Sequence, residues 1–371
     1  MTGYGPARIA EWSRREALRL LGLGGAGLAA ACSDAREPVA ESAPPTGSTG
    51  AEDVIVRTIL ADLAPDALSH GAVLFHEHMS LDIPFWDRLV GAENPARESF
   101  IGSPDSPYFM QDVDVMVEEL QAAAREGVAA LVDGGHADMG RDVSFLRAVS
   151  EQSGMPIVVS GGYYTDPFHP PALADQTDDE IAEALAEAAT TERWGAFGEI
   201  ASSAEMTPGE RKVFQAIGKA HLLTNVPIFT HTANGLEAEA QLDIFESLGV
   251  PPGSVAIGHM GGLDDPEATV HRRLAERGAF VGFDRLGGGP EADGHKVPMI
   301  RALIDAGHLE HVLLASDFAR ASDIQRNGGP GYAKTVTQFV PLLRESGVTE
   351  EQIRVMTVDN PLRLLAFAPP A

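Results

Sequence analysis

The strongest constraint on the fold is the regular alternation of short apolar runs with helical segments along most of the chain. Segments such as DVDVMVEELQAAAREG (112–127) carry apolar residues at three- and four-residue spacing, which is typical of helices that pack one face on a core. The apolar runs between such segments are short enough to be buried strands. These runs cover residues 71–78, 128–135, 156–164, 194–200, 226–231, 254–259, 278–284 and 311–317.

Eight predicted strands, each followed by a helix or a loop, predict a (β/α)8 TIM barrel, an α/β fold. A barrel of this kind commonly needs about 250 residues, and the chain has 371. The rival is a doubly wound open sheet, but no glycine-rich phosphate loop follows the first run. We therefore expect one barrel domain over residues 53–371, with its functional site at the C-terminal ends of the strands.

We identify candidate metal ligands at the ends of five of the eight runs. His76 and His78 lie two positions apart at the end of the first run, so both can face the mouth of the barrel while Glu77 faces the surrounding helices. A lone histidine at a strand end is more often structural, but the C-terminal ends of all the strands meet at one face of a barrel. The full set is His76, His78, Glu199, His231, His259 and Asp317.

This set is too large for one ion. Six ligands exceed the four of a tetrahedral zinc site, so we expect two divalent ions that share a carboxylate. Zinc is the first expectation, and manganese or cobalt would accept the same ligands. The remaining histidines are interpreted as surface or structural residues, with His169 as the first exception to consider.

Residues 1–32 are predicted to be an export signal. Arg14 and Arg15 precede a short apolar stretch and small residues that end at Cys32, in the segment SRREALRLLGLGGAGLAAAC. The SRREAL start resembles a twin-arginine signal, which carries folded proteins. The LAAAC end resembles a lipoprotein cleavage site, after which Cys32 would be the lipidated first residue. A plain signal cut nearby, with Cys32 incidental, is the alternative.

The next residues, 33–52, are rich in Pro, Ser, Gly and Ala and are predicted to form a disordered linker. The mature protein is therefore expected in the periplasm or at the cell surface. It would contact a membrane only through a lipid anchor at Cys32.

Composition disfavours several other functions. With 27 basic and 54 acidic residues the formal charge is −27, which would repel nucleic acids and anionic lipid heads. Cys32 is the single cysteine, so neither an intrachain disulfide nor a multi-cysteine metal site can form. The expected partner is a small-molecule substrate, and a homodimer stays open as the assembly.

Ordered sequence blocks resemble the phosphotriesterase family of the amidohydrolase superfamily over residues 55–369. The resemblance implies that His76, His78 and Asp317 hold the more buried metal ion and that His231 and His259 hold the more exposed one. It also implies that Asp317 is both a ligand and the catalytic base. The blocks are GAVLFHEHMSLD, GRDVSFLRAVSEQSGMPIVVSGGYYTDPFHP, FTHTANG, IGHMGGLDD, LLASDFAR and TVDNPLRLLAF.

Two positions depart from the usual pattern of the family. Glu199 stands where a carboxylated lysine usually bridges the two ions, and its carboxylate supplies the same two oxygens on a shorter stem. This resembles the phosphotriesterase-related, homology-protein-like branch. Arg285 stands where phosphotriesterases tend to have a histidine, and lactonase-like relatives more often have arginine. Tyr163 and Tyr164 are expected to line the substrate pocket or to cap the rim of the barrel.

The predicted activity is that of a binuclear metal-dependent hydrolase, in which a bridging hydroxide attacks a lactone or ester carbonyl or a phosphoester. Organophosphate hydrolysis and N-acyl amide hydrolysis are alternatives within the same chemistry. A non-catalytic ligand-binding lipoprotein is the alternative of another class, although none of the six candidate ligands is missing. The loop over residues 321–334 is expected to decide among substrates.

Overall fold

The computed structural model of this protein describes residues 54–104 and 106–370. The predicted export signal, its Cys32 and the predicted linker lie outside the described residues. No helix in the described part is long and apolar enough to cross a membrane.

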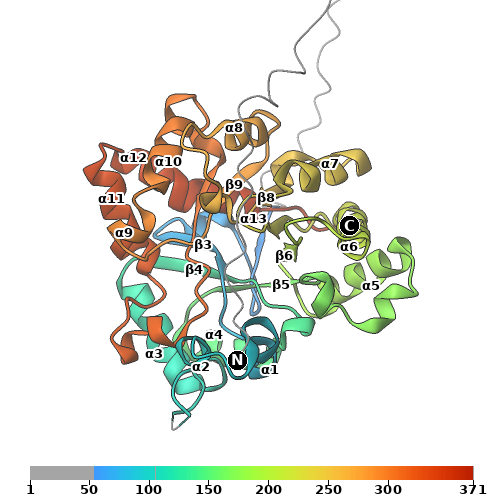
Figure 1. Ribbon diagram of the computed structural model, residues 1–371, viewed down its shortest axis with the longest axis horizontal. Coiled ribbons are helices and arrows are strands. Elements are labelled where there is room, and N and C mark those ends of the chain that lie inside the picture. Colours follow the sequence, from blue (N-terminus) through green and yellow to red (C-terminus); the bar gives the residue numbers. More distant parts are fainter. Residues whose placement is uncertain (1–53, 105, 371) are drawn as a thin grey trace, which may run out of the picture. The chain divides into compact units, whose positions relative to one another are not determined.

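Eight parallel strands form one sheet in which neighbours along the chain are neighbours in space (Figure 1). Each strand falls on one of the predicted apolar runs, with β6 extending to Ala201. The strands are β3 (Ala72–Glu77), β4 (Val128–Asp133), β5 (Ile157–Gly161), β6 (Ala196–Ala201), β7 (Ile228–His231), β8 (Val255–Ile257), β9 (Phe280–Phe283) and β10 (Val312–Leu314).

Backbone hydrogen bonds between the first and last strands bring the sheet close to a closed barrel. The nitrogen of Asp317 donates to the carbonyl of His76 at 3.1 Å, and the nitrogen of His78 donates to the carbonyl of Phe318 at 3.0 Å. The predicted (β/α)8 barrel is therefore confirmed. Because this seam runs beside two of the candidate ligands, closing the barrel also positions them.

Glu77 lies between the two histidines and is buried at the seam. Its carboxylate accepts hydrogen bonds from the nitrogens of Ser316 (2.9 Å) and Phe318 (2.8 Å) and from the hydroxyl of Ser316. Burial raises the pKa of Glu77 to about 7, although these hydrogen bonds oppose the rise. The side chain therefore ties β3 to the chain that follows β10.

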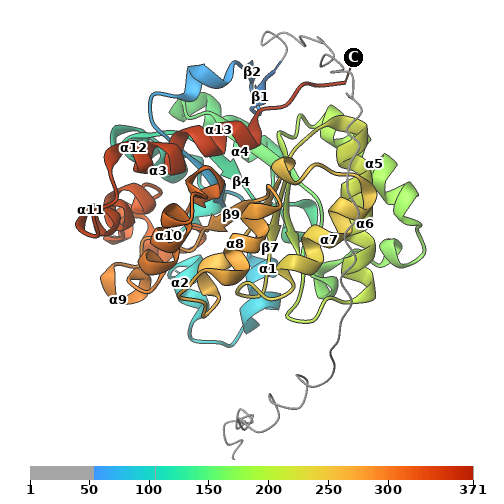
Figure 2. The ribbon, with the colours of Figure 1, turned by 90° about the horizontal axis from the view of Figure 1, so that it is seen from above.

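Helices lie around the outside of the strands (Figures 1 and 2). The longer helices are α3 (Val113–Arg125), α4 (Val143–Ser153), α5 (Asp178–Thr191), α6 (Pro208–Thr224), α7 (Ala238–Leu248), α8 (Thr269–Glu276) and α10 (Lys296–Asp305). Among these longer helices, capping boxes start α5, with Thr177 and Glu180, and α6, with Thr207 and Glu210.

Shorter elements complete the barrel. The segment between β3 and α3 contains α1 (Ile83–Trp86) and α2 (Arg97–Ile101), and the chain ends with α11 (Val340–Glu345), α12 (Glu350–Arg354) and α13 (Asn360–Leu365). A small hairpin precedes the barrel strands and consists of β1 (Val56–Arg57) and β2 (Asp62–Leu63).

Large apolar side chains fill the barrel interior beneath the strand ends. Phe75 and Phe229 meet edge to face with ring centroids 6.3 Å apart. Two glycines make room for them, because a Cβ at Gly198 would lie 2.3 Å from the ring of Phe229 and a Cβ at Gly282 would lie 2.8 Å from the ring of Phe75. The ring of His76 packs 5.1 Å from that of Phe229, so this core is the floor of the candidate site.

Candidate metal centre

All six predicted ligands converge at the C-terminal face of the barrel. His76 lies on β3, Glu199 on β6 and His231 at the end of β7, while His78, His259 and Asp317 follow β3, β8 and β10. His259 and Asp317 adopt left-handed backbones, with φ of 59° and 49°. Such backbones are uncommon for residues other than glycine and are found at functional sites.

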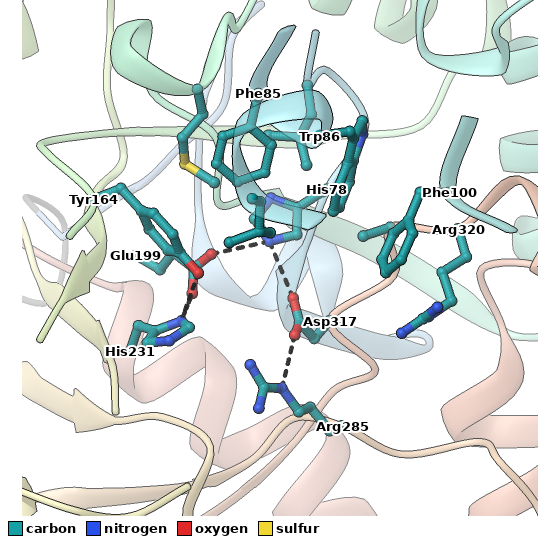
Figure 3. Close-up of a pocket in the computed structure, with 14 residues that line it drawn as sticks. His78, Phe85, Trp86, Phe100, Tyr164, Glu199, His231, Arg285, Asp317 and Arg320 are labelled. Carbon is teal, nitrogen blue, oxygen red and sulfur yellow. Dashed lines mark hydrogen bonds and ion pairs between the residues drawn. The ribbon is translucent and has the colours of Figure 1, made fainter. Parts of the chain in front are cut away.

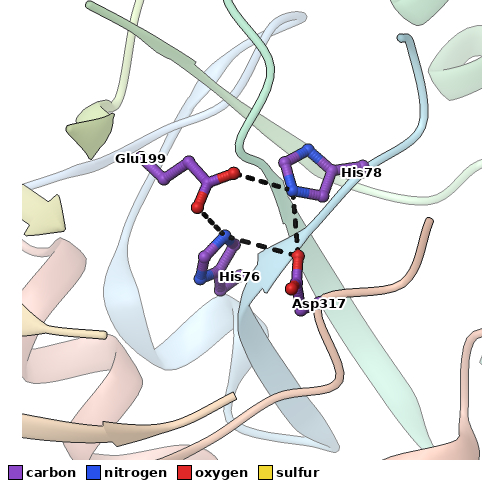
Figure 4. Close-up of side chains that lie close together, drawn as sticks. All are labelled: His76, His78, Glu199 and Asp317. Atoms are coloured by element: carbon purple, nitrogen blue, oxygen red, sulfur yellow. Dashed lines mark ion pairs between the residues drawn. The ribbon is translucent and has the colours of Figure 1, made fainter. Parts of the chain in front are cut away.

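Four of the six side chains form a first donor cluster (Figure 4). His78 Nε2 lies 3.2 Å from Glu199 Oε1 and 3.1 Å from Asp317 Oδ1. His76 Nε2 lies 3.3 Å from Glu199 Oε2. Two ligand atoms about 2.0–2.1 Å from a tetrahedral ion are themselves about 3.3 Å apart, so these spacings suit an ion held among the four side chains.

A second donor cluster shares Glu199 with the first. Glu199 Oε2 lies 2.7 Å from His231 Nδ1 and 3.4 Å from His259 Nε2. The two imidazole nitrogens are 2.9 Å from each other. One glutamate therefore presents oxygens to both clusters, which is the geometry expected of a carboxylate shared by two ions.

The side chains of the centre fit metal ions chemically. His76 Nε2 is buried and has no hydrogen-bond partner in the described part of the chain, as expected for an atom that a metal would satisfy. Burial and the neighbouring His259 lower the pKa of His231 to about 4, which keeps that imidazole in the neutral form that ligates metals. Burial would raise the pKa of Asp317, but His78, His259 and Arg285 hold it well below its usual value. Mixed imidazole and carboxylate donors suit zinc, manganese and cobalt.

Asp284 orients two of the ligands and was not singled out in the sequence. Its Oδ2 accepts from His76 Nδ1 at 2.7 Å, and its Oδ1 lies 2.9 Å from His259 Nδ1 and accepts from the His259 nitrogen at 2.7 Å. These contacts engage Nδ1 of both rings and leave Nε2 to face Glu199. The available signal was the carboxylate that ends the seventh run, FVGFD, directly before Arg285.

A cavity of about 360 Å³ opens above the donor clusters (Figure 3). This is within the size range of small-molecule sites. One wall is apolar and comes from the segment after β3, which the sequence did not single out. The cavity is lined by His78, Leu81, Phe85, Trp86, Leu89, Phe100, Met139, Tyr164, Glu199, His231, Arg285, Asp317, Ala319 and Arg320.

Of the two tyrosines that were expected at the pocket, Tyr164 lines the cavity and Tyr163 does not. Tyr164 lines the cavity, with its hydroxyl 3.5 Å from His231 Nδ1, and its nitrogen donates to Asp138 at 2.8 Å. Tyr163 does not line the cavity and instead has its ring 6.1 Å from that of His169. His169 does not belong to either donor cluster. Its Nε2 contacts the carbonyl of Tyr164 at 2.8 Å.

Arg285 lines the cavity and contacts a predicted ligand. Its Nε donates to Asp317 Oδ2 at 3.0 Å, and its Nη1 donates to Asn234 Oδ1 at 3.2 Å. The side chain is 44% exposed, so part of its guanidinium faces the cavity.

The loop over residues 321–334 is not among the cavity-lining residues, contrary to the expectation that it would select the substrate. The loop packs against α3, where the nitrogens of Gln325 and Arg326 donate to Glu119 at 3.0 and 3.1 Å. The hydroxyl of Tyr332 donates to the carbonyl of His78 at 2.7 Å. This loop therefore contacts the chain directly after β3, and the segment after β3 lines the cavity.

A family model and several known proteins match most of this chain. The model of the Phosphotriesterase family matches residues 56–365. The phosphotriesterase homology protein of Escherichia coli (strain K12) is 29% identical over 299 residues, which are 78% of this chain and 96% of that protein. The N-acetyltaurine hydrolase of Salmo salar is 25% identical over 346 residues, which are 84% of this chain and 98% of that protein.

Solved structures show the same barrel. The crystal structure of the Escherichia coli phosphotriesterase homology protein, complexed with phosphate in its active site, has a TM-score of 0.70 at 28% identity and covers 80% of this chain and 99% of that chain. A resiniferatoxin-binding protein from Rhodobacter sphaeroides has a TM-score of 0.74 at 28% identity and covers 84% of this chain and 95% of that chain.

We expect the substitution Asp284→Asn to weaken metal binding about 10–100-fold, because an amide cannot accept from both Nδ1–H groups. Competition with a chromogenic chelator measures this. The matched control is Glu119→Gln, a buried carboxylate that accepts two backbone hydrogen bonds on α3. Equal metal affinity in wild type and Asp284→Asn would contradict the orienting role.

We also expect metal loading to be independent of bicarbonate, because Glu199 already carries the carboxylate that a lysine would have to acquire. Metal content and activity would be compared after reconstitution with and without added bicarbonate. The matched variant is Glu199→Ala, which should retain fewer ions per chain. A clear rescue of wild-type activity by bicarbonate would count against Glu199 as the shared ligand.

Proposed function

This chain belongs to the phosphotriesterase family, and from this premise we propose that it is a binuclear hydrolase that attacks the carbonyl carbon of an ester or a lactone and cleaves its acyl carbon–oxygen bond. A metal-dependent hydrolase is the activity that the family and the named relatives support. The observation that carries the finer proposal is the position of Glu199, whose oxygens face two donor clusters at the floor of a cavity.

The metal ions would supply the nucleophile. Two divalent ions bound at these clusters would lower the pKa of a water held between them to about 7 and would polarise the oxygen of the scissile group. A nucleophilic serine or cysteine is not required for this chemistry.

Asp317 is placed to accept the proton of the attacking water. Its Oδ1 faces His78 at 3.1 Å and its Oδ2 contacts Arg285 at 3.0 Å. Its pKa is well below the usual value, so the carboxylate is ionised at neutral pH. The side chain is 18% exposed, so the proton can pass to water in the cavity.

Arg285 and Tyr164 are placed to orient the substrate. Arginine has no acceptor and stays protonated, so Arg285 cannot relay a proton as a histidine could. Its free N–H groups can donate to an oxygen of the substrate. Burial and the nearby carboxylates of Glu199 and Asp317 raise the pKa of Tyr164 well above its usual value, so its hydroxyl stays a donor.

N-acyl amide hydrolysis is the second candidate. This candidate is favoured by the relatives named N-acetyltaurine hydrolase. The match with the Salmo salar protein covers 98% of that protein. An amide needs its leaving nitrogen protonated. Asp317 could return to that nitrogen the proton that it accepted.

A substrate panel tests these activities. Protein lacking residues 1–32 would be loaded separately with zinc, manganese and cobalt and assayed with an ester, a lactone, an N-acyl amide and a phosphotriester. We expect turnover of the ester or lactone, and we expect Asp317→Asn to lower kcat by about 10²–10⁴-fold. Metal content would be measured for both proteins, because Asp317 is also a predicted ligand.

Each outcome of the panel is informative. Turnover of the amide alone would favour the second candidate. Two bound ions with no turnover of any substrate would favour a ligand-binding protein, the function in the name of the Rhodobacter sphaeroides relative.

Export with a lipid anchor is a separate proposal that rests on the sequence of residues 1–32. A buried metal centre suits the twin-arginine route, because a folded protein can take up its ions before export. In a bacterial host we expect Cys32→Ala to move the protein from the membrane fraction to the soluble fraction. Fractionation with an antibody measures this, and a wild-type protein found wholly in the soluble fraction would contradict the anchor.

A further inference from the structure

The cavity above the metal centre contains two arginines with different surroundings. Arg285 pairs with the carboxylate of Asp317. Arg320 donates to the neutral hydroxyl of Ser99, at 3.2 Å, and stacks on the ring of Phe100 at 4.0 Å. Among the described residues Arg320 has no carboxylate partner at the edge of the cavity.

The support beneath Arg320 does not depend on a ligand. The ring of Phe100 packs 4.4 Å from that of Trp86, and Trp86 Nε1 donates to the hydroxyl of Tyr108 at 2.8 Å. Trp86 and Tyr108 are buried. A guanidinium stacked on this wall keeps in its plane the N–H donors that are not bonded to Ser99, and a pair of such donors matches the two oxygens of a carboxylate or sulfonate.

Among the described residues that line the cavity, no carboxylate contacts Arg320. The carboxylates that line the cavity are Glu199 and Asp317, and both are directed at imidazoles or at Arg285. The positive charge of two divalent ions would exceed the combined negative charge of the carboxylates of Glu199, Asp317 and Asp284. The cavity would therefore attract anions although the whole chain has a formal charge of −27.

Arg320 and the second donor cluster lie at opposite sides of the cavity. Figure 3 shows Arg320 beside Phe100, away from Tyr164 and His231, with Phe85 and Trp86 along the wall between them. A molecule in the cavity could thus place one end at the metal centre, its apolar part against the aromatic wall and its other end at Arg320.

We propose that Arg320 is a specificity-determining residue that binds a carboxylate or sulfonate group carried by the substrate away from its scissile carbonyl. The proposal rests on the proposed function, because it takes cleavage at the metal centre as given. It narrows the substrate class to acyl compounds with an anionic end group. The guanidinium does not take part in the bond cleavage.

Two esters of equal length test the proposal. Mono-4-nitrophenyl glutarate ends in a carboxylate where 4-nitrophenyl pentanoate ends in a methyl group, and the scissile bond is the same. We expect wild type to prefer the glutarate ester in kcat/KM. Arg320→Gln should lower the ratio of the two kcat/KM values by about 10-fold or more, the effect of one charge-assisted hydrogen bond. Arg320→Lys should retain part of the ratio, because it keeps the charge without the planar donor edge.

Arg88→Gln is the matched control. Arg88 is an exposed arginine that stacks on Phe168 at 4.9 Å, donates to the carbonyl of Pro167 and does not line the cavity. This variant should leave the ratio unchanged. An unchanged ratio in Arg320→Gln, or an equal loss for both esters, would overturn the proposal.

Direct binding separates this proposal from the proposed function. Calorimetric titration of metal-loaded protein with glutarate and with pentanoate reports the contribution of the second carboxylate without any turnover. We expect tighter binding of glutarate in wild type and loss of that difference in Arg320→Gln. If wild type hydrolyses neither ester, the proposed ester hydrolysis fails, and the titration alone decides the role of Arg320.

Discussion

The carboxylate of Glu199 is the interaction on which the rest of the site depends. It lies among four imidazoles, with oxygen-to-nitrogen distances between 2.7 and 3.4 Å, and it is 2% exposed. A buried charge is tolerated only when it is paired or coordinates a metal. The contacts come from β3, β7 and the turn after β8, so this one side chain on β6 constrains how four segments of the barrel meet.

Barrel closure and ligand placement use the same hydrogen bonds. The bond from Asp317 to the carbonyl of His76 joins the end of β10 to β3 and also brings one ligand beside another. Glu77, which lies between the two histidines, also stabilises this seam through hydrogen bonds from the nitrogens of Ser316 and Phe318. A change that opens the seam would therefore alter the metal centre as well as the fold.

The side chains expected to select the substrate lie on different segments from the candidate metal ligands. The metal donors belong to strands or to the turns that follow them, whereas the apolar wall and Arg320 belong to longer connections. Barrel enzymes commonly vary their chemistry through such loops. The segment after β3 contributes most of the apolar wall, which makes it the part of the chain where a change of substrate would be expected to arise.

Local patterns in the sequence were sufficient to predict the eight strands, the barrel and the convergence of six candidate ligands. Strand periodicity and the residue types at strand ends depend only on residues that are close together in the sequence. Other features depended on partners far along the chain. Asp284 contacts His76 across 208 positions, and the stacking of Arg320 on Phe100 at the cavity is visible only in the tertiary structure. Tyr163 and Tyr164 are adjacent and follow the end of β5, where strand alternation no longer decides direction. The contact with Asp138 places Tyr164 at the cavity, and only the tertiary structure supplies that contact.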